Sequence, residues 1–217
     1  MFDIFTRDGL IAFLYTLPAL LFCLSIHEFA HAYTAYKLGD KSQKALGRLT
    51  LNPIKHIDVF GFICIALFGF GWGKPVMIDD RNFKNKAGGS ALTALAGPLS
   101  NLIMAIIFTI ILKILMITGV VGLSLKTTLS TILLNMFMLT IQFNIVFAVF
   151  NMIPIPPFDG SRVLYYFLTP KLREKMYYLE RYSFIIILIL FVTKLGSLII
   201  SPIIEAINYI IIWFLML

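Results

Sequence analysis

The chain has few of the side chains from which soluble enzymes build their surfaces and active sites. Only 13% of its 217 residues are charged, and it contains three histidines and two cysteines. A composition that is 59% hydrophobic, with a mean hydropathy of +0.92, excludes a soluble globule and predicts a polytopic membrane protein. Cys23 and Cys64 lie in apolar stretches and provide neither a disulfide framework nor a CxxC motif.

The formal net charge of +7 could indicate a nucleic-acid partner, but the basic residues fall between apolar segments. Half of them lie within residues 37–89, and a second group lies within 162–181. The positive-inside rule explains this pattern better and assigns both regions to the cytoplasm. We therefore expect the N-terminus outside and no nucleic-acid partner.

Four apolar segments are candidates for membrane spans, and a fifth is weaker. The candidate spans are 10–36, 87–117, 129–153 and 184–201, with 203–217 as either a fifth span or an interfacial helix. No small-residue cleavage site closes the first segment, so we expect a retained span and not a signal peptide. At this length the sequence predicts one domain, residues 1–217.

Residues 59–72 (VFGFICIALFGFGW) are strongly apolar but too short to cross a membrane. Aromatic and β-branched residues between glycines favour a cytoplasmic re-entrant segment, in the form of a β-hairpin that dips toward the active site. Non-helical backbone at that depth must be covered by protein or face a wet cavity. A strand edge there could pair with an extended substrate, and a purely structural surface anchor fits equally well.

Two of the three histidines fall in the pattern His27-Glu28-Phe29-Ala30-His31, inside the first predicted span. Residues four apart share a helix face, so His27 and His31 can bind one ion with Glu28 beside its open position. This is the arrangement of zinc hydrolases, in which two imidazoles hold Zn²⁺ and the carboxylate acts on water. Ionisable groups inside a span are functional by default, which favours this interpretation over two structural histidines.

A catalytic zinc usually takes three protein ligands. Asp159 follows the end of the third span, where three prolines in four positions break the helix, and broken helices near membrane depth usually line a site. The first and third spans run in the same direction, so His31 and Asp159 come to similar depth. His56, in the basic loop, is a second candidate, although that loop could hold a solvated histidine without further purpose.

Asn101 lies with Pro98 inside the second span, where an amide needs a partner. We favour a packing hydrogen bond for it over a role in the site.

Three motifs in order resemble the site-2 protease family of intramembrane zinc metalloproteases, peptidase family M50. They are HExxH at 27–31, AlaGlyProLeuSerAsn at 96–101 and AsnxxProxProxxAspGly at 151–160. Residues 47–58 and 71–76 resemble a loop of the family's short bacterial and archaeal members, and the whole resemblance covers about residues 15–170.

The resemblance implies a three-helix catalytic core and one zinc ion per chain. It implies His27, His31 and Asp159 as ligands, Glu28 as general base, and Asn151 near the zinc, where it could steady an oxyanion. The sequence departs from the family pattern at Phe158, usually leucine, which should leave ligation intact. It has no PDZ or CBS domain, so regulation through those modules cannot be carried over.

Together these patterns predict an all-α polytopic zinc metalloendopeptidase that cleaves in or near the transmembrane segments of membrane proteins. One alternative is another HExxH membrane protease, which would need Glu174, Glu180 or Glu205 as third ligand. A second is a non-catalytic metal-binding protein or transporter. A transporter would be expected to repeat its polar residues across pseudo-symmetric halves, and an inactive protein would be expected to have lost Glu28 or a ligand. The abundance of Ile, Phe, Lys and Asn indicates an AT-rich prokaryote, so we expect the cell membrane of a prokaryote, with the active site toward the cytoplasm.

Overall fold

The computed structural model describes residues 6–68, 71–121, 128–193 and 195–217. Within these residues the regular structure is helical, apart from one isolated antiparallel bridge between Ile57 and Gly73. The helices are α1 (Arg7–Leu38), α2 (Ser42–Ala45), η1 (Pro53–Lys55), α3 (Val59–Phe68), η2 (Asp80–Asn82), α4 (Lys86–Ile117), α5 (Thr128–Asn151), α6 (Asp159–Phe167), α7 (Pro170–Glu180), α8 (Ser183–Val192) and α9 (Leu195–Met216). The prediction of an all-α protein is confirmed.

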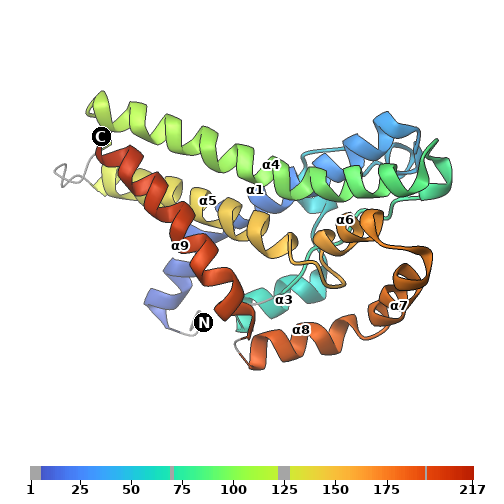
Figure 1. The fold of residues 1–217 in the computed structure, drawn as a ribbon. Helices are drawn as coiled ribbons and strands as arrows, with labels where there is room; N and C mark the ends of the chain where they lie inside the picture. The colour runs from blue at the N-terminus through green and yellow to red at the C-terminus, as the bar shows by residue number, and fades with distance from the viewer. Residues whose placement is uncertain (1–5, 69–70, 122–127, 194) are drawn as a thin grey trace.

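Four of the described helices are long and apolar enough to cross a membrane: α1, α4, α5 and, over Gly196–Met216, α9. The chain is therefore an integral, polytopic membrane protein. Helices α1, α4 and α5 pack on one another and form a three-helix layer, and α6 lies against α4 (Figure 1). Helix α9 crosses α5 obliquely, and the Lys113 ammonium on α4 donates to the Leu215 carbonyl at its end.

Local sequence signals set the two ends of α1. The Thr6 hydroxyl accepts a hydrogen bond from the Gly9 N–H, which satisfies one of the unpaired donors of the first turn. At the other end Gly39 adopts φ 116°, a conformation that favours glycine, and its N–H bonds to the carbonyls of Ala35 and Tyr36. The chain therefore turns back sharply after α1, directly beyond the HExxH motif.

The expected fourth span, 184–201, is divided between two helices. Helix α8 ends at Val192, where the Thr193 N–H and hydroxyl both bond to the Ile189 carbonyl, and α9 begins at Leu195. Ten residues of α-helix are about 15 Å long, half of a bilayer core, so α8 does not span on its own. The long helix is α9, which incorporates most of the segment that the sequence left as either a span or an interfacial helix.

The predicted β-hairpin at 59–72 is wrong, because Val59–Phe68 form helix α3; residues 69–70 of that segment lie outside the described residues. Asp58 begins the helix: its carboxylate accepts from the Gly61 N–H and its carbonyl from the Phe62 N–H. An aspartate before an apolar run is a helix start signal. It outweighs the aromatic and β-branched content that favoured a strand.

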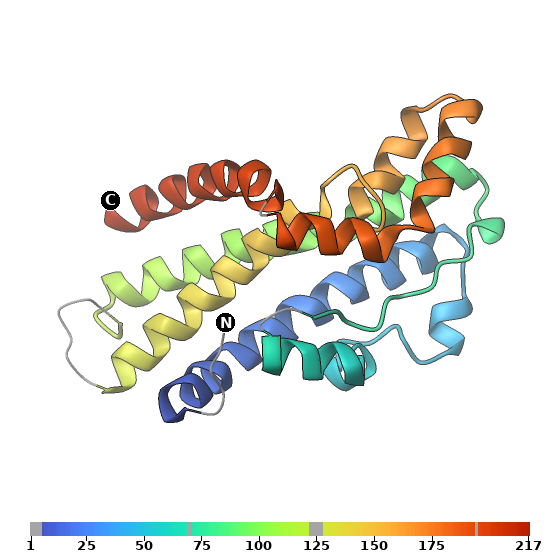
Figure 2. The same cartoon turned by 90° about the horizontal axis from the view of Figure 1, so that it is seen from below.

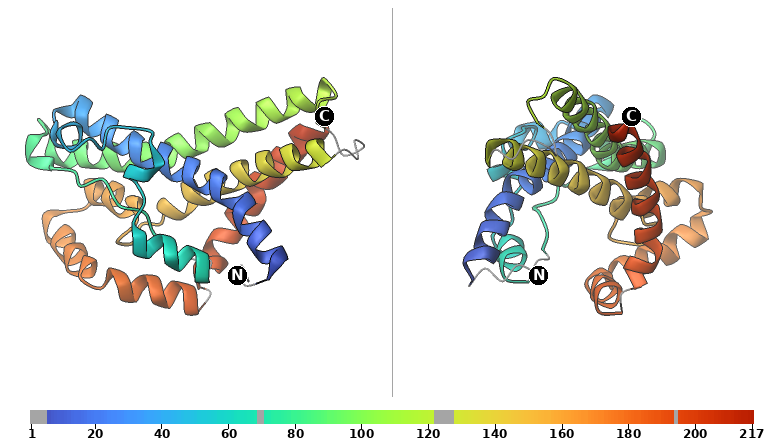
Figure 3. Two further views of the ribbon diagram at one scale, coloured as in Figure 1. Left: turned by 180° about the vertical axis from the view of Figure 1, so that it is seen from behind. Right: turned by 90° about the vertical axis from the view of Figure 1, so that its left-hand side faces the viewer.

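Helix α3 lies beside the N-terminal half of α1, where Phe62 packs edge-on against Phe13 with ring centroids 6.2 Å apart (Figure 2). Helices α3 and α8 lie on the same side of the three-helix layer, apart from one another (Figures 1 and 3). Residues of α1, α3, α5, α8 and α9 together line a pocket of about 960 Å³. The fold thus places a large apolar pocket on the face of the layer that carries the HExxH motif.

Candidate metal centre

His27, His31 and Asp159 meet at a single point between α1 and the start of α6. The Asp159 Oδ2 atom lies 3.1 Å from His27 Nε2 and 3.2 Å from His31 Nε2, and the two Nε2 atoms are 3.0 Å apart. Both histidines are buried, and Asp159 Oδ2 is buried without a hydrogen-bond partner. Among the described residues this is the group of His, Cys, Asp and Glu side chains whose ligand atoms are close enough to share one metal ion.

The hydrogen bond on the far side of the His31 ring fixes its tautomer. His31 Nδ1 lies 2.7 Å from the Thr93 carbonyl oxygen, which can only accept, so Nδ1 carries the proton. In the neutral ring the His31 Nε2 atom therefore directs a lone pair at Asp159. A backbone carbonyl that orients a histidine in this way is a common partner of metal-binding imidazoles.

A chain of buried amides fixes the His27 tautomer in the same sense. Asn144 Nδ2 donates to the Thr140 carbonyl, so Asn144 Oδ1 faces Asn101 and accepts from its Nδ2 at 2.9 Å. Asn101 Nδ2 also donates to the Cys23 carbonyl, which leaves Asn101 Oδ1 to accept from His27 Nδ1 at 2.7 Å. In the neutral His27 ring, Nε2 consequently carries a lone pair as well, which also faces Asp159.

This donor set fits a zinc ion. Two imidazole lone pairs and a carboxylate oxygen within 3.2 Å of one another repel unless a proton or a metal ion lies among them. Three donors bound about 2.1 Å from a tetrahedral zinc ion are about 3.4 Å apart, close to the observed spacing. Two histidines and one carboxylate, leaving a fourth position open, are the ligands of a catalytic and not a structural zinc site.

Gly97 on α4 provides the space for both imidazoles. A Cβ atom at this position would overlap the His31 ring and come within 2.7 Å of the His27 ring. Because both rings are held by the hydrogen bonds of their Nδ1 atoms, neither can move away at low cost. This close approach gives a physical reason for the glycine of the AlaGlyPro sequence at 96–98.

Glu28, beside His27 on α1, is buried, and its Oε2 atom accepts a hydrogen bond of 2.8 Å from the Val76 N–H. Val76 belongs to an extended stretch, residues 73–79, that leads toward η2 and α4 (Figure 2). The carboxylate is therefore oriented by a backbone amide 48 residues away in the sequence.

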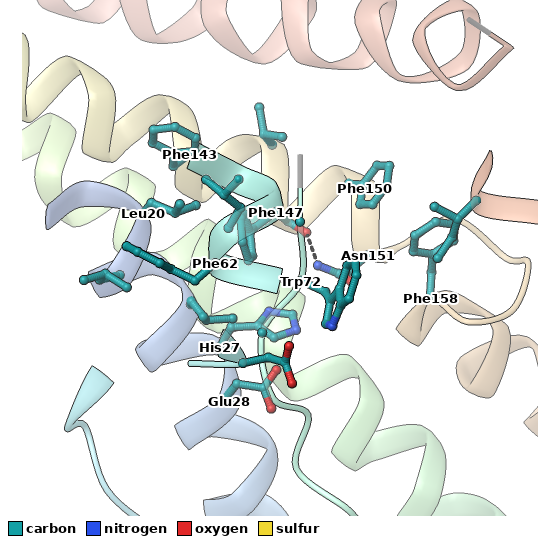
Figure 4. A pocket seen from close by; sticks show the side chains of 18 of the residues that line it. Leu20, His27, Glu28, Phe62, Trp72, Phe143, Phe147, Phe150, Asn151 and Phe158 are labelled. Carbon is teal, nitrogen blue, oxygen red and sulfur yellow. Dashed lines mark hydrogen bonds between the residues drawn. The ribbon is translucent and has the colours of Figure 1, made fainter. Parts of the chain in front are cut away.

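The pocket brings further predicted residues to the same place. His27, Glu28 and Asn151 all line it, and Figure 4 shows the His27 and Glu28 side chains near Asn151 and Trp72. The Asn151 Nδ2 atom donates to the Phe147 carbonyl of its own helix at 3.0 Å. The rest of the lining is mostly apolar and aromatic, including Phe143, Phe147 and Phe150 of α5.

The structure does not bring His56 to this group. His56 is fully buried, and its Nε2 atom bonds to the Thr50 carbonyl at 2.8 Å within the loop after α2. It is therefore neither the solvated histidine that the loop composition suggested nor part of the cluster around Asp159.

Asn101, for which we favoured a packing hydrogen bond, contacts the site directly through His27. The sequence did indicate that Asn101 forms a hydrogen bond, since a buried amide in an apolar span needs a polar partner. The partner could not be read, because His27 and Asn101 are 74 residues apart. Thr93, whose contribution is its backbone carbonyl, had no side-chain signal at all.

Replacing Asn101 by leucine is expected to weaken zinc binding about 10- to 100-fold, the usual effect of losing the partner of a metal-binding imidazole. The leucine removes the acceptor of the His27 Nδ1 proton and frees the ring to change tautomer. Zinc affinity measured by competition with a chelator tests this. The matched control is Asn135→Leu on the exposed face of α5, which should bind zinc as the wild type does; an unchanged affinity for Asn101→Leu would contradict the role of the hydrogen bond.

A HExxH helix and a distant aspartate that meet inside a bundle of membrane helices define the class of zinc-dependent membrane hydrolases. Comparison with known families gives the particular one. The model of peptidase family M50 matches residues 15–120 and 111–193. The chain belongs to this family, that of the site-2 proteases, and it is a metalloprotease, as its motifs indicated.

The curated relatives agree. The chain is 43% identical over 192 residues, 88% of its length and 86% of the relative's, to the Bacillus subtilis protein named "Putative zinc metalloprotease YwhC". It is 27% identical to Rip2 of Mycolicibacterium smegmatis, covering 83% of this chain and 68% of that one, and 30% identical to MJ0611 of Methanocaldococcus jannaschii, covering 71% and 77%. Both carry the same zinc metalloprotease designation. No solved structure matches the chain.

Proposed function

We propose that the protein is a zinc-dependent intramembrane endopeptidase that cleaves membrane proteins in or near their transmembrane segments. The observation that carries the proposal is the meeting of His27, His31 and Asp159 inside the helix layer, with Glu28 beside them in an apolar pocket. His27, His31 and Asp159 are the proposed ligands of one zinc ion per chain. The whole chain, residues 1–217, acts in this proposal as one catalytic domain.

When bound, zinc would polarise the scissile carbonyl and activate a water molecule as the nucleophile. Glu28 takes the proton of that water as general base and delivers it to the leaving amine nitrogen. The Val76 N–H holds the Glu28 carboxylate through one oxygen and leaves the other free to take the proton. His27 and His31 keep their protons on Nδ1, bound to Asn101 and Thr93, and so take no part in the transfer.

Asn151 is the proposed stabiliser of the oxyanion. An amide nitrogen carries two N–H groups, and one of them is used on the Phe147 carbonyl. The second remains for the oxygen of the tetrahedral intermediate, and the position of Asn151 in the same pocket as His27 and Glu28 supports this role.

The substrate is a transmembrane protein or peptide in the lipid bilayer. The pocket that adjoins Glu28 is lined mostly by apolar side chains of membrane helices, which suit an apolar polypeptide segment. A helical segment hides its carbonyls in hydrogen bonds, so it must be extended locally before hydrolysis. The basic residues after α1 and on α7 support a cytoplasmic position for this end of the molecule, with the N-terminus outside, in the membrane of a prokaryotic cell.

The alternatives have less support. A different HExxH protease class would use a later glutamate as the third ligand. Among the described residues, however, Glu174, Glu180 and Glu205 do not lie with His27 and His31. A non-catalytic metal protein or transporter has no need of the buried carboxylate of Glu28 beside an open zinc position.

Zinc removal tests the proposal. We expect the purified protein in detergent to contain one zinc ion per chain and to cleave a reconstituted transmembrane peptide. We expect a chelator to abolish cleavage and added zinc to restore it. A soluble peptide with the same residues around the cut, but without the apolar segment, is the control and should be cleaved poorly. Cleavage that persists in zinc-free protein would overturn the proposal.

A further inference from the structure

The extended stretch 73–79, here called the strap, passes over the HExxH end of α1 and holds Glu28 through the Val76 N–H. Outside a sheet, such a stretch must find other partners for its backbone groups. Its first residues are tied to the loop after α2, where the Lys74 N–H bonds to the His56 carbonyl at 2.8 Å and Gly73 pairs with Ile57. Further partners are side chains within residues 40–48.

Three buried polar side chains bind the strap backbone in order along the chain. The Arg48 Nη2 atom donates to the Lys74 carbonyl at 2.6 Å and to the Pro75 carbonyl at 3.3 Å. Gln43 Nε2 donates to the Met77 carbonyl, and the Asp40 carboxylate accepts from the Asp79 N–H at 2.9 Å. Residues 40, 43 and 48 are 0%, 2% and 7% exposed, so none of these groups is a solvated surface side chain.

The Asp40 end of the strap is held by a charged acceptor. Burial raises the pKa of Asp40, but the N–H groups of Asp79 and Ser42 and the Asn82 side chain lower it by more, and the pKa lies below its usual value. The carboxylate is therefore ionised and anchors the strap next to Gly39, where α1 ends.

Arg48 is unusual in its partners. Among the described residues it forms no ion pair, and its Nε atom is buried without a hydrogen-bond partner. A buried guanidinium is normally paired with an acid. Here its charge is directed at two consecutive carbonyls of the strap.

The second of these carbonyls, that of Pro75, belongs to the same peptide unit as the N–H that binds Glu28. The Pro75 carbonyl and the Val76 N–H belong to one planar trans peptide unit, in which C=O and N–H point in opposite directions. Arg48 therefore binds one end of the unit while Glu28 binds the other. Fixing the carbonyl fixes the direction of the N–H, and a cation on the carbonyl strengthens the amide as a donor.

We propose that Arg48 is the positioning residue of Glu28: its guanidinium fixes the Pro75–Val76 peptide unit, and the N–H of that unit holds the carboxylate of the general base. The inference rests on the proposed function for the role of Glu28. It assigns a role in the reaction to a residue that is neither one of the proposed zinc ligands nor part of the pocket lining.

The test uses Arg48→Ala and Arg48→Lys in the full-length protein, with cleavage of a transmembrane peptide, zinc content, and hydrogen exchange of the strap followed by mass spectrometry. We expect Arg48→Ala to retain wild-type zinc and KM and to lose about 10- to 100-fold in kcat, the scale of a small misplacement of a catalytic group. The strap amides should exchange faster. Lysine keeps the positive charge but not the planar guanidinium group. Arg48→Lys should therefore have a kcat and a strap exchange rate between those of the wild type and Arg48→Ala.

Chemical rescue separates positioning from a general effect on folding. Guanidinium at a few tens of millimolar should restore part of the kcat and of the strap protection in Arg48→Ala, and should not affect Glu28→Gln. Arg7→Ala is the matched control. Arg7 is exposed in the first turn of α1, at the end opposite the HExxH motif, so its loss should leave kcat, zinc and the exchange of the strap unchanged.

The outcomes are distinct. If both Arg48 variants keep the wild-type kcat, or lose zinc together with activity, the inference is overturned. If Arg48→Ala does not fold, Arg48→Lys decides by the same measurements. If the wild type itself does not cleave the peptide, the proposed function fails. The claim that Arg48 holds the strap is tested separately, and unchanged hydrogen exchange of the strap in the Arg48 variants would overturn it.

Discussion

Glu28→Gln is expected to bind one zinc ion per chain and to cleave at least about 10²- to 10⁴-fold more slowly than the wild type, the usual contribution of a general base. Glutamine has the size of glutamate, and its carbonyl oxygen can still accept from the Val76 N–H. The strap and the ligand cluster should therefore remain as they are. What is lost is the group that accepts the proton of the nucleophilic water.

The measurement pairs zinc content by elemental analysis with cleavage of a reconstituted transmembrane peptide. Glu174→Gln, the same change on the exposed face of α7, is the control and should keep both zinc and activity. A Glu28→Gln protein that cleaves at the wild-type rate would show that this carboxylate is not the base. A protein that has lost its zinc would show that Glu28 supports the metal centre instead.

Asp159→Ala is expected to lose both zinc and cleavage. Removing the carboxylate leaves two imidazoles as the ligands, and the loss in affinity should exceed the about 10- to 100-fold that is typical of losing a mere hydrogen-bond partner of a ligand. Because Oδ2 is the atom that faces both Nε2 atoms, no other described carboxylate can replace it without a movement of the chain. Chelator competition and elemental analysis give the affinity and the occupancy.

Two variants sharpen this test. Asp8→Ala changes an exposed aspartate in the first turn of α1, at the end opposite the HExxH motif, and should leave zinc in place. His56→Ala examines the other candidate for third ligand and should also retain zinc, since the His56 ring bonds to the Thr50 carbonyl. If Asp159→Ala keeps its zinc while His56→Ala loses it, the assignment of the third ligand is wrong.

The sequence indicated the membrane class and the chemistry because both depend on local patterns. Apolar length predicts a span, and three of the predicted spans nearly coincide with α1, α4 and α5. Two histidines four residues apart share a helix face in any fold that keeps that stretch helical. The proline break made Asp159 a candidate, and the structure brings this residue to the two histidines.

Local patterns failed where two signals competed over a short segment. In α3 the Asp58 cap prevailed over aromatic and β-branched content, and after α8 a break divided a stretch that composition alone left continuous. In both cases apolar composition indicates that a segment is buried or lies in lipid. It does not indicate whether the segment forms one helix, a strand or two helices.

By itself, then, the sequence determined that the chain crosses a membrane and carries a zinc-hydrolase motif, because those properties follow from the order of neighbouring residues. Only the tertiary structure decided what orients the motif. Asn101 and Thr93 fix the two imidazole tautomers, and the strap, held by Arg48, fixes Glu28. Asn101, Thr93 and Val76 lie 48 to 74 residues from the motif residues that they bind. Two of these contacts are made by backbone atoms: a carbonyl, which every residue has, and an N–H, which every residue except proline has. Such contacts leave no trace in the identity of a residue and become visible only when the helices are packed.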